Sequence, residues 1–300
     1  MSRAVSEIEE GTPAGYEILQ SFPAVEPCVI GWTGWPGAGK SSLIGRIVSA
    51  RRVHSPNTRI AILAVDPSSS FTGGALLGDR IRMDDLALDD RVYIRSLAAR
   101  GGGGALSPAV MRIARFLASA GFSEIHIETV GAGQSDVLIR SYADLTILVV
   151  PPHAGDVIQG LKAGILEIAD LFVVNKCDLD GASATAMALE SALTAGDSDT
   201  QAPAILLASA KEMRGIAEIA NEVESRLVVL GETGAVEKRW MQRRESEFRA
   251  QLAADMMKHF ERSGAFAKMA EEVRTGARSP WSAAAEICRA IEEAGRGQGR

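Results

Sequence analysis

Short apolar runs alternate with longer segments of helical periodicity from residue 28 to residue 208. Several runs, such as Leu145–Val150, are continuously apolar, which is typical of strands that are covered on both faces. Repeated strand and helix units of this kind predict an α/β fold with a doubly wound, mostly parallel sheet. The predicted strands are Cys28–Thr33, Arg59–Asp66, Val92–Ser96, Glu124–Val130, Asp144–Val150, Leu171–Asn175 and Ala204–Ser209.

The pattern changes on either side of this region. Proline and glycine interrupt residues 1–27, so we expect a short leader with little regular structure beyond one short helix. After residue 231 a helical arm is predicted, with two further helices around Phe266–Val273 and Ala283–Ala294. The domains are therefore 1–27, 28–231 and 232–300. Apolar residues recur in the arm in steps of four or eight, at Val236, Trp240, Phe248, Leu252, Met256 and Phe260.

Net charge indicates which partners are unexpected, and the cysteines indicate the cellular compartment. With 32 basic and 38 acidic side chains the formal charge is −6, so neither nucleic acid nor a membrane is expected as a partner. The three cysteines lie far apart and follow no signal peptide, which favours the cytoplasm. No apolar run is long enough to span a bilayer.

The strongest chemical signal is the segment Gly34–Ser41, which matches the pattern G-x-x-x-x-G-K-[ST] between a strand and a helix. A glycine-rich turn could carry the same letters by chance, but this context favours a phosphate site. Its backbone N–H groups would cradle phosphate oxygens, Lys40 would reach the β- and γ-phosphates, and Ser41 would ligate Mg²⁺. The predicted cradle consists of Gly34, Gly37, Ala38, Gly39, Lys40, Ser41 and Ser42.

A second motif predicts which base the bound nucleotide carries. Asn175-Lys176-Cys177-Asp178 places N-K-x-D after an apolar strand, at the edge where open α/β sheets bind ligands. A carboxylate there could accept hydrogen bonds from both N–H donors of guanine. The alternative is a simple turn or helix cap, in which Asn and Asp are also common. The loop after the last strand would contact the guanine oxygen. Its residues are Ser209, Ala210 and Lys211.

Three carboxylates follow predicted strands near the phosphates: Asp66, Asp79 and Glu128. Each alone would equally suit a solvated cap or a salt bridge. Together they favour direct or water-mediated Mg²⁺ binding and orientation of the attacking water. Glycine-rich loops lie beside them. This favours switch segments that become ordered when the γ-phosphate is bound and are released when it is lost.

On these motifs the chain resembles the methylmalonyl-CoA mutase-associated GTPase family, the G-protein chaperones of cobalamin-dependent acyl-CoA mutases in the SIMIBI class of P-loop GTPases. The resemblance covers roughly residues 28–230. It rests on Gly34–Ser41, Ala64–Gly74, Gly78–Met83, Glu128–Ser135, Gly155–Lys162 and Asn175–Asp178.

The resemblance implies a homodimeric GTPase that uses GTP/GDP and Mg²⁺, binds a B12-dependent acyl-CoA mutase, gates adenosylcobalamin loading and helps remove damaged cofactor. Residues 28–231 would be its P-loop GTPase domain, and residues 232–300 a dimerisation arm. The apolar residues that recur along the arm would suit packing on its own core equally well. On this resemblance, we expect residues 1–27 to hold little of the family's N-terminal helical extension. The segment Arg95–Gly101 resembles the isobutyryl type more than the methylmalonyl type, so the expected client would be a methylmalonyl-, isobutyryl- or hydroxyisobutyryl-CoA mutase.

The same resemblance implies roles for individual residues. Asp66 and Asp79 would serve Mg²⁺ binding and hydrolysis, and Glu128 and Gln134 the second switch. The remaining switch residues are Arg82, Asp156 and Lys162.

Two alternatives remain. A P-loop phosphotransferase acting on a small acceptor would use the same phosphate loop and carboxylates, but seldom needs guanine selectivity. A nickel-type metallochaperone GTPase would need clustered metal ligands, whereas the four histidines here are scattered.

Overall fold

The computed structural model divides the chain into two compact units, Met1–Glu245 and Ser246–Arg300. Each is described by itself. The residues that the structure describes are 1–23, 25–66, 86, 88–98, 108–129, 134–154, 166–194, 203–262 and 264–297.

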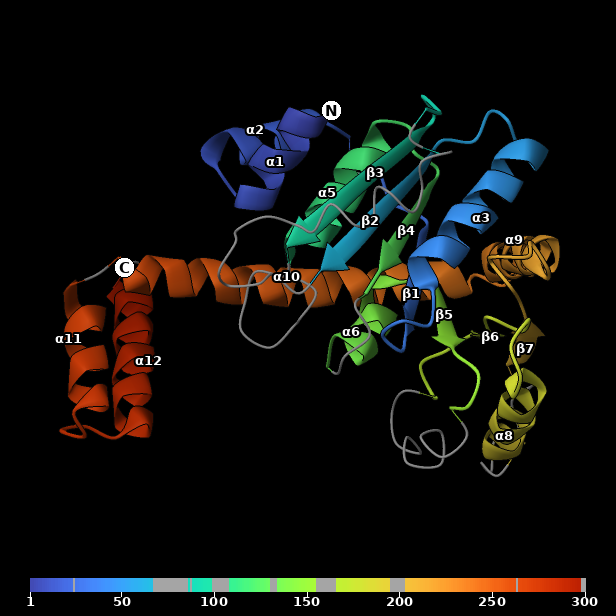
Figure 1. The fold of residues 1–300 in the computed structure, drawn as a ribbon. Coiled ribbons are helices and arrows are strands. Elements are labelled where there is room, and N and C mark those ends of the chain that lie inside the picture. Colours follow the sequence, from blue (N-terminus) through green and yellow to red (C-terminus); the bar gives the residue numbers. More distant parts are fainter. Residues whose placement is uncertain are drawn as a thin grey trace. The chain divides into compact units, whose positions relative to one another are not determined.

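The first unit is built on a seven-stranded sheet in the order β3-β2-β4-β1-β5-β6-β7 (Figure 1). Every pairing between these strands is parallel. This confirms the predicted α/β fold and each of the seven predicted strands, with ends shifted by one or two residues. The strands are β1 Val29–Gly34, β2 Ile60–Asp66, β3 Val92–Ala98, β4 Glu124–Glu128, β5 Leu145–Val150, β6 Leu171–Val174 and β7 Ala204–Leu207.

Helices cover both faces of the sheet (Figure 1). Because side chains alternate along a strand, Ile60 and Ile62 of β2 join the apolar cluster under α3 and α9, whereas Ala61 and Leu63 join the cluster under α5 and α6. A third cluster packs β5 and β6 against α8. The sheet is therefore doubly wound. These helices are α3 Lys40–His54, α5 Pro108–Ser119, α6 Gln134–Tyr142, α8 Ala182–Thr194 and α9 Ile216–Glu232.

Residues 1–27 contain more regular structure than expected, because two helices are present where one was predicted: α1 Ser2–Glu10 and α2 Pro13–Ser21. Gly11 ends α1 in the left-handed conformation, with φ of 67°. Thr12 then caps α2, and its Oγ1 accepts a hydrogen bond from the Gly15 N–H at 3.1 Å. Glycine and proline here mark a boundary between helices, since Pro is well tolerated in a first helical turn.

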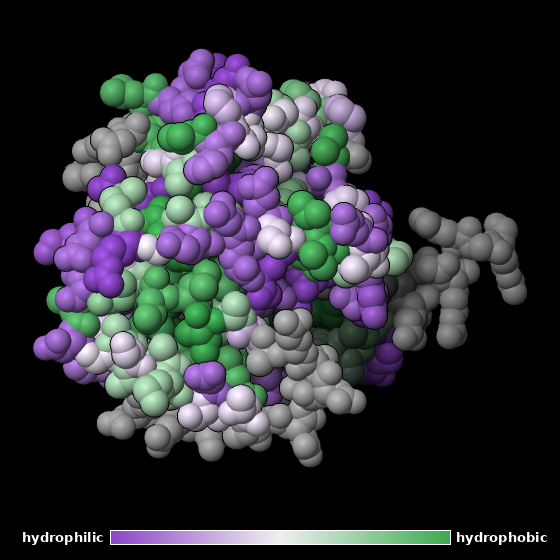
Figure 2. All heavy atoms as spheres, turned by 90° about the vertical axis from the view of Figure 1, so that its right-hand side faces the viewer, coloured by the Kyte–Doolittle hydropathy of each residue, from purple (hydrophilic) through white to green (hydrophobic). Residues whose placement is uncertain are grey.

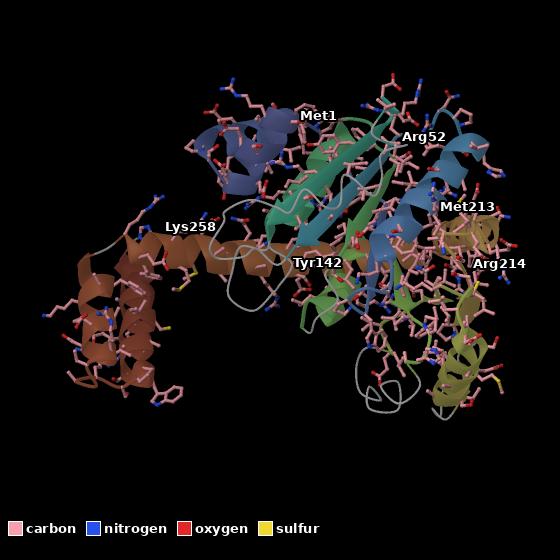
Figure 3. All side chains as sticks on the ribbon, in the orientation of Figure 1. Met1, Arg52, Tyr142, Met213, Arg214 and Lys258 are labelled. Carbon is pink, nitrogen blue, oxygen red and sulfur yellow. The ribbon has the colours of Figure 1, made fainter. Side chains whose placement is uncertain are left out.

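Three helices follow the sheet domain, as predicted: α10 Ala235–Glu261, α11 Gly264–Arg274 and α12 Pro280–Gly297. The first turns of α10 belong to the first unit, where Arg243 is 2% exposed. Arg243 donates to the carbonyl oxygen of Tyr142 at 2.9 Å, at the end of α6 (Figure 3). It also pairs with Asp144 and Glu26. Buried ion pairs thus anchor the start of this helix to the sheet domain.

Little of the second unit is buried. Among its described residues, Ala283 is the one buried apolar side chain, whereas Phe248 is 66% and Trp281 80% exposed. Arg278 links α11 to α12 through Glu272, at 2.8 Å, and Glu286. A unit with so small a core leaves apolar surface available for a partner.

The surface of the described residues is mixed. Hydrophobic residues gather in the lower half of the face shown in Figure 2. Exposed apolar side chains of the first unit include Met187 of α8 and Val228 and Val229 of α9. Within the described part of the chain, none of the helices combines the length and apolar character that crossing a membrane requires.

Candidate nucleotide site

The phosphate loop leaves β1 at Gly34 and enters α3 at Lys40. Gly34 has φ of 128°, and a Cβ there would overlap the carbonyl oxygen of Val149. Gly39 has φ of 86°, and a Cβ there would lie 2.6 Å from Nδ2 of Asn175. Both positions need glycine, because other residues rarely adopt these angles and no side chain fits.

Lys40 is held across this loop and is 5% exposed. Its Nζ donates to the carbonyl oxygens of Gly34, at 2.9 Å, and Trp35, at 3.1 Å. A cation so placed, at the N-terminus of a 15-residue helix, makes a strongly anion-attracting environment.

Ser41 and Glu128 meet beside the loop. The Ser41 hydroxyl donates to Oε1 of Glu128 at 2.7 Å, and both side chains are buried. Glu128 ends β4, which pairs with β1, so the sheet brings this carboxylate to the phosphate loop. A hydroxyl and a carboxylate are the oxygen donors that Mg²⁺ accepts, and the residues present therefore fit this ion.

Asn175 ties three loops together. Its Nδ2 donates to the carbonyl oxygen of Ala38 at 2.8 Å, and its Oδ1 accepts from the backbone N–H of Ala210 at 3.2 Å. Lys176, with φ of 62°, stretches its Nζ to the carbonyl oxygen of Gly37 at 2.7 Å. The phosphate loop and the loops after β6 and β7 are thus joined by hydrogen bonds into one wall of the site.

Asp178 follows on the same wall. Its Oδ1 is buried and has no hydrogen-bond partner among the described residues. A hydrogen bond from Ser209 lowers the pKa of the Asp178 carboxyl, with further help from the charges of Lys211 and Arg214. Arg214 lies on the loop between β7 and α9 (Figure 3). The carboxylate is therefore ionised at neutral pH and offers a buried acceptor to a ligand with N–H donors.

A cavity of about 460 Å³ lies between the start of α3 and the loops after β6 and β7, and Lys40, Ser41 and Glu128 are not among its lining residues. Eight of the residues predicted for nucleotide binding line it: Gly39, Ser42, Asn175, Lys176, Asp178, Ser209, Ala210 and Lys211. The sequence analysis missed Gly45, Arg46 and Ser49 of α3, and Leu179. Helical periodicity from Ser42 would have found the first three, because they continue the same helix face.

Several predicted residues lie outside the described residues: Asp79, Arg82, Asp156 and Lys162. The backbones of Asp66 and Gln134 end β2 and begin α6, but their side chains also lie outside the described part. Within that part, no three His, Cys, Asp or Glu side chains gather into a possible metal site. The nickel alternative thus gains no support from the described residues.

A buried polar network holds the far end of α3. Arg51 of α3 pairs with Glu124 at the start of β4, and Nε2 of His126 lies 3.5 Å from the same carboxylate. Nδ1 of His126 accepts from the indole N–H of Trp32 at 3.0 Å. Burial raises the pKa of Glu124, but the nearby His126 imidazole and the hydrogen-bonded Arg51 guanidinium outweigh it and lower the pKa to about 2. Helix α3 is thus tied to both ends of β4.

Comparison with known proteins agrees with this geometry. A family model described as "Methylmalonyl Co-A mutase-associated GTPase MeaB" matches residues 1–265. GTPase ArgK of Escherichia coli (strain K12) is 34% identical over 235 residues, covering 77% of this chain and 70% of ArgK. The Caenorhabditis elegans methylmalonic aciduria type A homolog, mitochondrial, is 29% identical and covers 87% of this chain and 67% of that protein. A crystal structure of an LAO/AO transport system kinase has a TM-score of 0.67 at 25% identity, covering 97% and 92% of the two chains.

Proposed function

The chain belongs to the methylmalonyl-CoA mutase-associated GTPase family, MeaB, and from this premise we propose that it is a GTP-hydrolysing chaperone of a B12-dependent acyl-CoA mutase. In this role it gates adenosylcobalamin loading and helps remove damaged cofactor. The family model, matching most of the chain, is the observation that carries the proposal. That the chain is a GTPase follows from the family and from relatives named as GTPases.

Guanine recognition is assigned to the cavity beside Asp178. The unpartnered Oδ1 supports this, because guanine presents two N–H donors on one edge and adenine does not. The Lys176 stem would cover one face of the base, and the backbone N–H of Ala210 or Lys211 would reach the guanine oxygen. The open cavity leaves room for a base in this position.

Phosphate handling is assigned to Lys40, Ser41 and Glu128. Lys40 would exchange its carbonyl contacts for the β- and γ-phosphates, because an ammonium group is attracted more strongly to an anionic phosphate oxygen than to a neutral carbonyl oxygen. Ser41 and Glu128 would hold Mg²⁺, which neutralises charge on the phosphates when bound. Asp66 and Asp79 would join them in hydrolysis, and the proposed switch residues are Arg82, Gln134, Asp156 and Lys162.

The assembly is proposed to be a cytoplasmic homodimer on a mutase of the methylmalonyl-, isobutyryl- or hydroxyisobutyryl-CoA type. Residues 1–27 would form the leader, 28–231 the GTPase domain and 232–300 the dimerisation arm. Exposed Phe248, Leu252 and Trp281 in the arm support contact with a second copy. Three cysteines without a disulfide are consistent with a reducing compartment.

Capture of the client tests this proposal. The tagged chain, loaded with a non-hydrolysable GTP analogue, with GDP or with no nucleotide, is incubated with each B12-dependent acyl-CoA mutase of its native host. We expect one mutase to be retained in amounts that change with the nucleotide. Asp178→Asn serves as the matched control, since it should remove that nucleotide dependence at guanine-nucleotide concentrations that saturate the wild type. Retention of none of the mutases would contradict the proposal.

A further inference from the structure

Two buried threonines join the ends of β1 and β4 beside Glu128. Thr129 follows Glu128, and its backbone N–H donates to the carbonyl oxygen of Trp32 at 2.9 Å. The Thr129 hydroxyl lies 3.1 Å from Oγ1 of Thr33 and 3.3 Å from the Trp32 oxygen. Thr33 is 0% and Thr129 1% exposed, so the hydroxyl contact is shielded from water.

Packing alone does not explain these hydroxyl groups. Valine has nearly the same shape, suits a strand equally well and avoids the cost of burying a hydroxyl. The described pairing of β1 with β4 ends at Trp32 and Glu128, so Thr129 lies one residue past it. Beyond this point β1 runs on through Thr33 into the phosphate loop. One residue beyond the last paired residues, the hydroxyl pair thus adds a side-chain contact to the backbone hydrogen bond that joins Thr129 to Trp32.

We infer that the Thr33–Thr129 hydroxyl pair positions Glu128 against Ser41, which makes Thr129 a positioning residue for the Mg²⁺-dependent binding of nucleotide. This rests on the proposed function, in which Ser41 and Glu128 hold Mg²⁺. The Ser41 contact to Glu128 is 2.7 Å long, and the carboxylate is attached to the residue immediately before Thr129. A small rotation of the chain at Thr129 therefore moves the carboxylate directly.

Neighbouring β5 offers a matched control. Thr146 is also 0% exposed and lies in a strand that pairs with β1. Its Oγ1, unlike that of Thr129, has no hydrogen-bond partner among the described residues. Thr146→Val therefore removes a buried hydroxyl from the same sheet without removing a hydrogen bond within the described part of the chain.

The test compares the Kd for GDP in Mg²⁺ and in EDTA for the full chain and its variants. Thr129→Val should raise the Kd in Mg²⁺ about fivefold, the size expected for one disturbed hydrogen bond, and leave the Kd in EDTA within about twofold. Thr129→Ser, which keeps the hydroxyl, should restore the wild-type value in Mg²⁺. Thr146→Val should change neither constant.

Thr33→Val removes the partner hydroxyl and provides a second route to the same result if Thr129→Val does not fold. Equal losses in Mg²⁺ and EDTA, or no loss in either, would overturn the inference while leaving the proposed function intact. A wild-type chain whose GDP binding does not respond to Mg²⁺ would instead overturn the Mg²⁺ role of Ser41 and Glu128, and the inference with it.

Discussion

Asp178 is the residue on which base selectivity depends. Its Oδ1 is buried without a partner among the described residues, and a hydrogen bond from Ser209 lowers the pKa of a carboxyl that is ionised at neutral pH in any case. In Asp178→Asn the side chain gains an N–H donor and loses one acceptor. Xanthine carries a carbonyl oxygen where guanine carries its amino group, so the variant should match xanthine better.

We expect Asp178→Asn to weaken GTP binding by at least about tenfold and to strengthen XTP binding, since a mismatched buried polar pair costs more than one hydrogen bond. Competition of GTP, XTP and ATP for the site measures this. Parallel loss of all three nucleotides would show a damaged fold and would refute the assignment of Asp178 to the base.

The sequence predicted which residues of the base site gather, because N-K-x-D and Ser209–Lys211 both follow strands of one parallel sheet. It did not reveal how Asn175 works. Its hydrogen bonds to Ala38 and Ala210 join segments more than 30 residues apart, and depend on tertiary placement alone. Arg46 and Ser49 were missed for another reason, since a motif of consecutive letters ignores helix faces.

Helix α3 and strand β4 form a pair held at both ends. Ser41 meets Glu128 at one end, and Arg51 meets Glu124 at the other. The pKa of Glu124 in the folded chain is about 2, below its usual 4.5. Its stabilising contribution is therefore fully present above pH 4.5 and is lost as the pH falls towards 2.

Glu124→Gln should accordingly lower the free energy of unfolding at pH 7 by about 3 kcal/mol, because Arg51 loses its buried counter-charge. The gap between wild type and variant should narrow by about 2 kcal/mol from pH 5 to pH 3. Urea unfolding at each pH measures both. A gap that stays constant with pH would exclude the lowered pKa as its cause.

Element prediction succeeded where the hydrophobic pattern was strong. Seven continuously apolar or alternating runs became the seven strands of the sheet. It fell short at residues 1–27, where glycine and proline predict a single short helix and the structure has two. Val5 and Ile8 of α1 are buried in the cluster under α5. That burial depends on contacts with α5, about 100 residues away in the sequence. The nine residues of α1 therefore give only a weak signal of their own for a packed helix.

At the scale of the whole molecule, the chain combines a GTPase sheet domain with a second unit that has almost no core among its described residues. Helix α10 belongs to both, and Arg239 and Arg243 fasten its first turns to Asp170 and Asp144. Asp144 and Asp170 directly precede β5 and β6, the strands that lead to residues 155–162 and to the base motif. The sequence predicted the helices of the arm, but it gave no signal for these ion pairs, because they join residues 69 and 99 positions apart.

The central claim, that GTP hydrolysis serves a mutase, is tested most directly by the rate of phosphate release from GTP with and without the client. We predict slow hydrolysis by the chain alone, acceleration when the cognate B12-dependent acyl-CoA mutase is added, and little release from ATP in either case. The same rate of phosphate release from GTP with every mutase of the host as without it would contradict the account.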